Sequence, residues 1–146
     1  MVEYKTAKHP IPVIVGVDEI KNASRRREDA IKPLELMLQA IHAAATDAIG
    51  AEKANLIRHL DGVSVVASST WPYTDLPGLI SQNLGIRPKH TAYSALSGNS
   101  PVQLIDDAAQ LIAQGRLEAV AIVGGEALAS CMSGLYDSTL DGVLTP

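Results

Sequence analysis

The sequence has 146 residues, of which 47% are hydrophobic and 19% charged, and its formal net charge is −4 at pH 7. This length suffices for one domain with one hydrophobic core. The negative net charge argues against nucleic acid and anionic membranes as partners, because both bind to basic protein surfaces. One cysteine cannot form an intrachain disulfide and no apolar run is long enough to span a membrane, so we expect a cytoplasmic protein.

The first part of the chain predicts a strand followed by a long helix. Residues 11–17 (IPVIVGV) form an almost continuous apolar run, which is typical of a strand buried on both faces. A polar, aperiodic surface loop over 18–32 follows. Pro33 suits the first turn of a helix, and apolar residues recur from there at helical spacing as far as Gly50.

The rest of the chain continues the alternation of helix and strand. We predict, in order, a short helix at 51–60, a strand at 62–68, a helix at 76–84 closed by Gly85, a strand at 89–96, a helix capped by Asn99 or Ser100 and closed by Gly115, and a strand at 118–125. The buried stripe of the last helix should consist of Leu104, Ile105, Ala108, Leu111 and Ile112. Such alternation predicts an α/β fold with a mostly parallel sheet and helices on both faces. We treat residues 1–146 as a single domain whose sheet is incomplete, because the last twenty or so residues supply no closing element.

A turn of small residues, 97–100 (SGNS), opens the last predicted helix. The helix carries Asp107-Ala108-Ala109 and Ala113-Gln114-Gly115, and the strand after it ends in Gly124-Gly125-Glu126. In this order the residues resemble the thiolases (acetyl-CoA acetyltransferases), which have an N-R-x-C-x-S-G turn, a helix with D-A-A and A-x-G, and a strand ending G-G-x-E. The runs PVIVGV and LDGVSVVAS also resemble the first two strand–helix units of that family. The resemblance implies a thiolase-like half-fold, of which this chain supplies the N-terminal portion.

The resemblance places the family's nucleophilic cysteine at this turn, where a helix N-terminus favours a thiolate. Counting back from Gly115 puts Gly98 at that position, whereas matching the local letters puts Ser97 there. Neither residue is a thiol, and a serine hydroxyl is a poor nucleophile without an adjacent base. We therefore expect a vacant nucleophile turn at Ser97 and Gly98, and we name Ser97, Gly98, Asn99 and Ser100 as candidate substrate-binding residues.

The resemblance further implies a role in acyl-CoA and lipid metabolism, with acyl-CoA as the substrate and no tightly bound cofactor. A complementary thiolase-like chain or C-terminal segment, in a homo- or hetero-oligomer, would complete the sheet and any active site. This chain alone should be inactive as a thiolase, because thiolysis and condensation in the family both pass through an acyl-enzyme. The alternative is a non-catalytic interaction subunit that uses the half-fold for assembly, and a third possibility is an independent α/β domain.

Several other residues are functional candidates. Cys131 is either a nucleophile displaced from the turn at 97–100 or, as lone cysteines usually are, a small apolar side chain that packs in the interior. The run 25–29 (RRRED) offers guanidinium groups to phosphates, although its acidic neighbours partly cancel that charge. Trp71 stands in a loop that marks a partner surface or covers an apolar patch. The four histidines His9, His42, His59 and His90 lack metal-ligand spacing, so we predict no metal site.

Overall fold

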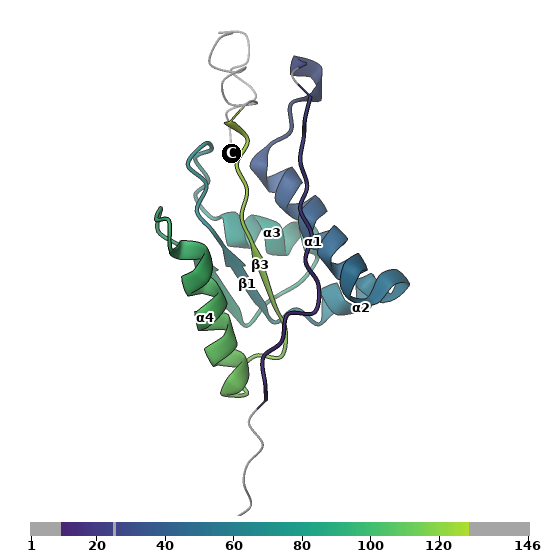
Figure 1. Ribbon diagram of the computed structural model, residues 1–146, viewed down its shortest axis with the longest axis vertical. Helices are drawn as coiled ribbons and strands as arrows, with labels where there is room; N and C mark the ends of the chain where they lie inside the picture. The colour runs from purple at the N-terminus through teal and green to yellow at the C-terminus, as the bar shows by residue number, and fades with distance from the viewer. Residues whose placement is uncertain (1–9, 25, 129–146) are drawn as a thin grey trace, which may run out of the picture.

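The computed structural model describes residues 10–24 and 26–128 and consists of helices around a small sheet (Figure 1). The elements, in chain order, are η1 (Arg27–Asp29), α1 (Pro33–Ile49), η2 (Gly50–Glu52), α2 (Lys53–Arg58), β1 (Gly62–Val65), α3 (Leu76–Leu84), β2 (His90–Tyr93), α4 (Ser100–Ala113) and β3 (Val120–Val123). The predicted α/β class is therefore confirmed.

The sheet has three parallel strands in the order β2-β1-β3. Gly62 at the start of β1 is in register with His90 of β2 and with Val120 of β3. All four residues of β1 are buried, as expected for the central strand of a parallel sheet. The strands β1, β2 and β3 lie inside the strands predicted at 62–68, 89–96 and 118–125, and each is shorter than predicted.

Helices lie on both faces of the sheet (Figure 1). On one face, α1 and α3 contribute Met37, Leu76 and Ile80 to a buried cluster with the strand residues Val63 and Val65. On the other face, α4 buries Leu104 and Ala108. The main core therefore lies between the sheet and the pair α1 and α3.

Local sequence signals fix the ends of these helices. Pro33 lies at the first position of α1, where its missing N–H leaves no intrahelical bond unmade. The carboxylate of Asp75 accepts a hydrogen bond from the Gly78 N–H at 2.9 Å and caps α3. Gly85 ends α3 with a φ of 68°, a left-handed conformation that glycine adopts without steric cost. The predicted bounds of α3 are confirmed.

The amino ends of the strands are joined by Asp61. Its carboxylate accepts hydrogen bonds from the N–H groups of Glu118 and Ala119, at 3.2 and 3.1 Å, and from the Lys89 Nζ at 3.1 Å. Burial is the largest single influence on the pKa of Asp61 and raises it, but these hydrogen bonds and the Lys89 charge together lower the pKa below its usual value. Asp61 therefore ties the segment before β3 to the start of β1.

The prediction of a buried strand at 11–17 is wrong. These residues are extended but belong to no sheet, and their large apolar side chains are exposed. The segment lies against α1: the Val17 N–H donates to Asp47 Oδ2 at 3.0 Å, and a Cβ on Gly16 would come within 2.2 Å of the Ala44 carbonyl oxygen. An apolar run becomes a buried strand only where another strand pairs with it, and among the described residues none does.

The buried stripe predicted for α4 is only partly right. Leu104 and Ala108 are buried and Leu111 and Ile112 are half-buried, but Ile105 is 46% exposed. The reason is that Ile105 lines an open hollow beside β3, and no described element covers it there. Sequence periodicity identified the apolar face but not how much of it the fold covers.

Candidate functional site

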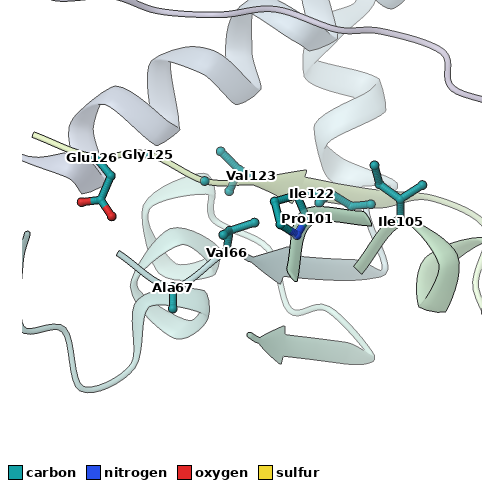
Figure 2. Close-up of a pocket in the computed structure, with 9 residues that line it drawn as sticks. Val66, Ala67, Pro101, Ile105, Ile122, Val123, Gly125 and Glu126 are labelled. Carbon is teal, nitrogen blue, oxygen red and sulfur yellow. The ribbon is translucent and has the colours of Figure 1, made fainter. Parts of the chain in front are cut away.

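The loops that follow β1 and β3 meet the first turns of α4 around an open, mostly apolar hollow of about 390 Å³. Its lining residues are Val66, Ala67, Pro101, Ile105, Ile122, Val123, Gly124, Gly125 and Glu126. Figure 2 shows Glu126 at one end of this row and Ile105 at the other. The hollow lies toward the carboxyl ends of parallel strands, where ligands of open α/β sheets usually bind.

The predicted turn at residues 97–100 immediately precedes, in the chain, the first residue of α4 that lines the hollow, Pro101. Ser97, Gly98 and Asn99 are exposed, whereas Ser100 is buried and its hydroxyl donates to the Ala95 carbonyl at 2.7 Å. Apart from Gly98 itself and the two residues next to it in the chain, no atom lies within 4 Å of where a Cβ on Gly98 would be, so the space at this position is open. None of the four candidate residues lines the hollow; the next residue, Pro101, does. Their role in substrate binding remains a prediction.

The start of α4 is not capped by a side chain. Asn99 occupies the N-cap position without a side-chain cap, so that part of the prediction is wrong. The Ser100 N–H donates to the Ser97 carbonyl at 3.1 Å and the Gln103 N–H to that of Asn99 at 3.0 Å. The Ser97 hydroxyl donates to Asn99 Oδ1 at 2.6 Å. An amide oxygen is not a general base, so this contact does not activate Ser97 as a nucleophile.

Sequence reasoning missed the most highly connected polar group at this edge of the sheet, the carboxylate of Glu126. It accepts hydrogen bonds from the Ser69 N–H at 2.7 Å, the Thr70 N–H at 3.1 Å, and the hydroxyls of Ser68 and Ser69, each at 3.0 Å. The Thr70 hydroxyl also donates to it, and that hydroxyl oxygen accepts from the Ala127 N–H at 3.1 Å. The loop after β1 is thereby joined to the loop after β3.

These contacts set the charge state of Glu126. Burial is the largest single influence on the pKa of this carboxyl and raises it, but the hydrogen bonds from Ser69, Thr70 and Ser68 together outweigh burial and lower the pKa below its usual value. Glu126 is therefore an anion at neutral pH beside an otherwise apolar hollow. A sequence signal for these contacts was available: the run Ser68-Ser69-Thr70 follows β1, and Glu126 follows the neighbouring strand β3.

The remaining candidates are not brought together at this site. Arg26 forms ion pairs with Glu28 at 3.5 Å and with Asp29 at 2.9 Å, so its acidic neighbours offset its charge as predicted. Trp71 is 3% exposed, so its side chain does not form an exposed partner surface in this chain. Across the described ranges, no group of three or more His, Cys, Asp or Glu side chains is placed to hold a metal ion. Arg25, His9 and Cys131 lie outside the described residues.

Among the residues that the structure describes, no helix is both long enough and apolar enough to cross a membrane.

Comparison with solved structures identifies similar folds. A monomeric SCP2-thiolase-like protein type 1 from Mycobacterium smegmatis superimposes with a TM-score of 0.64 at 28% identity, over 78% of this chain and 23% of that one. A variant of Xanthomonas campestris OleA with bound lauric acid and lauroyl-CoA superimposes with a TM-score of 0.58 at 22% identity, over 80% of this chain and 32% of that one. No protein-family model matches the sequence, and no curated protein matches it.

The chain spans only about a quarter to a third of the length of these similar proteins, 23% and 32% respectively. The superposition nevertheless covers 78% and 80% of this chain. The described residues have a partial thiolase-like fold, and the predicted resemblance to the thiolase superfamily is confirmed.

Proposed function

We propose that this chain is the N-terminal part of a thiolase-like protein of acyl-CoA metabolism, and that it binds an acyl-CoA without forming an acyl-enzyme. The observation that carries the proposal is the apolar hollow lined by Pro101, three positions after the open turn at Gly98. Similarity to an OleA variant that was determined with lauric acid and lauroyl-CoA supports this class of ligand.

The surroundings of the hollow suit a thioester with an apolar tail. Aliphatic side chains from β3 and α4 would contact the acyl chain, and a volume of about 390 Å³ is within the range typical of small-molecule sites. The partial positive charge at the start of α4 would face the thioester oxygen. Because Ser97 has no base beside it, we expect binding here without covalent transfer.

Any carbon–carbon chemistry would then depend on groups from a complementary thiolase-like chain or segment. Support for this partner comes from the limited coverage of the similar proteins, of which this chain matches 23% and 32%. The two parts would form a homo- or hetero-oligomer, or would be joined in one polypeptide.

Isothermal titration of the 146-residue chain with acetyl-CoA and lauroyl-CoA, with the mass in solution measured by light scattering, tests the proposal. Gly98→Trp should abolish binding by filling the turn. Gln82→Trp, an exposed position on α3 on the opposite face of the sheet, should leave binding unchanged. A stable monomer that binds neither ligand would contradict the proposal.

A second candidate function, assembly without catalysis, is favoured by a different observation. Apolar side chains remain exposed on the turn before α4 and on α4 itself, at Leu96, Val102 and Ile105. Exposed apolar patches are typical of interaction surfaces. An oligomer that binds no acyl-CoA in the same titration would support this function instead of the first.

A further inference from the structure

Glu126 is the only ionisable residue among the described residues that line the hollow. The other lining residues are aliphatic residues, glycine and proline. Figure 2 shows the Glu126 carboxylate at one end of the row of lining side chains, with Pro101 between it and Ile105. A ligand that lies along this row would therefore have one end close to a negative charge.

The carboxylate is fixed in this position by its own hydrogen bonds. Oε1 accepts from the Ser69 N–H at 2.7 Å and from the Ser69 hydroxyl at 3.0 Å. Oε2 accepts from the Thr70 N–H, the Thr70 hydroxyl and the Ser68 hydroxyl. A carboxylate has about four lone-pair sites, and these donors occupy them. Glu126 therefore cannot turn away from a ligand without losing these bonds, and it has no acceptor left with which to bind one.

The negative charge of Glu126 is not neutralised by these contacts, because every donor is an uncharged hydroxyl or amide. No ion pair joins Glu126 to a Lys or Arg side chain of the described residues. Hydroxyl and amide dipoles stabilise the anion but leave its net charge, which acts on a ligand at a distance. Glu126 therefore contributes repulsion of negative charge rather than a direct hydrogen bond.

The same charge favours one orientation of an acyl-CoA in the hollow. Coenzyme A carries negatively charged phosphates, which Glu126 would repel if the coenzyme lay on its side of the hollow. The opposite orientation directs the coenzyme away from Glu126 and the acyl group toward it. The far end of the acyl chain would then be the part of the ligand closest to Glu126.

We propose that Glu126 makes the hollow selective for acyl groups that end in an uncharged aliphatic group and disfavours acyl groups that end in a carboxylate. Specificity of this kind comes from an unfavourable interaction with the wrong ligand, not from a stronger contact with the right one. The aliphatic walls add to it, because they offer a second carboxylate no hydrogen bonds. The inference rests on the acyl-CoA binding of the proposed function and names the substrate class of the same site.

Isothermal titration of the 146-residue chain tests the inference with hexanoyl-CoA, adipoyl-CoA and 6-trimethylammoniohexanoyl-CoA as probes. The three thioesters share the coenzyme and the length of the acyl chain, and they differ in the end group. We expect hexanoyl-CoA to bind about tenfold more tightly than adipoyl-CoA. Apolar walls alone would disfavour both charged end groups. A nearby anion should instead make the cationic thioester bind about fourfold or more tightly than adipoyl-CoA.

Two matched variants assign the selectivity to one side chain. Glu126→Gln should reduce the preference for hexanoyl-CoA over adipoyl-CoA by about fourfold or more, because the amide is uncharged. Glu118→Gln, at an exposed position before the other end of β3, removes the same charge and should alter this preference by less than about 1.5-fold. The ratio within each variant cancels a general loss of affinity. If Glu126→Gln does not fold, the comparison of the two charged end groups in the wild-type chain still decides.

Equal affinity for hexanoyl-CoA and adipoyl-CoA would overturn the inference and leave acyl-CoA binding intact. The same holds for equal affinity for the two charged thioesters, or for an unchanged preference in Glu126→Gln. If none of the three thioesters binds, the result contradicts the proposed function itself, and the selectivity with it.

Discussion

The Glu126 carboxylate accepts a 2.7 Å hydrogen bond from the Ser69 backbone N–H, across 57 positions of sequence. This bond belongs to a group of contacts that holds two loops together beside the hollow. The geometry of the candidate site therefore depends on one ionised side chain at the end of β3.

Replacing Glu126 with glutamine should destabilise the chain by about 2 kcal/mol, because hydrogen bonds to a charged acceptor are stronger than those to an amide. The amide NH₂ would also face donors from Ser68 and Thr70. Urea unfolding of Glu126→Gln measures the loss. Glu19→Gln, at an exposed position, should change stability by less than about 0.5 kcal/mol. Equal stability of the two variants would show that the contacts at Glu126 contribute nothing.

The same carboxyl makes stability depend on pH. Since the pKa of Glu126 is lower in the folded chain than in the unfolded chain, its contribution is fully present above the unfolded value and is lost as pH falls through the folded value. The stability difference between wild type and Glu126→Gln should therefore shrink on acidification. Urea titrations in a pH series check this, and a difference that is constant down to strongly acidic pH would contradict it.

Asp61→Asn should destabilise the chain by about 1–3 kcal/mol, because it weakens acceptors for the Glu118 and Ala119 N–H groups. By contrast, Lys89→Met should cost less than about 1 kcal/mol, because the Lys89 side chain is 68% exposed and water screens its ion pair. Thermal unfolding of both variants tests the ranking. A larger loss for Lys89→Met would mean that the ion pair, not the backbone contacts, joins the strands.

Truncation of isoleucines on opposite faces of the sheet should have unequal effects. Ile80 of α3 is fully buried, so Ile80→Ala should cost about 2–5 kcal/mol. Ile105 of α4 is 46% exposed, and Ile105→Ala should cost less than about 1 kcal/mol. Urea unfolding compares the two. Similar losses would indicate that Ile105 and the hollow that it lines are covered in solution, for example in an oligomer.

Elements with strong local signals could be predicted from the sequence. The bounds of α3 follow from the cap at Asp75 and from Gly85, and Pro33 marks the first turn of α1. The central strand β1 was identifiable because a short apolar run between loops is typical of a buried strand. In each case the determining contacts lie within a few residues of one another in the chain.

Features that depend on distant neighbours could not be predicted. The run 11–17 has the composition of a buried strand, but strand formation requires a pairing partner, and composition does not supply one. The contacts of Glu126 join residues 56–58 positions apart, and no periodicity reveals them. At the turn 97–100, the vacant nucleophile position stays a prediction from the sequence, and the structure adds the open space at Gly98.

The exposed run 11–17 also affects how the chain behaves while it is alone. Aliphatic, β-branched segments of this length are prone to stack into fibrils. Pro12 interrupts the backbone donors near the start of the run, and Asp18 and Glu19 place two negative charges directly after it. Residues of this kind act as gatekeepers against aggregation. The sequence thus protects the run that it leaves exposed, and substitution of these three residues should shorten the time for which the chain stays dispersed at high concentration.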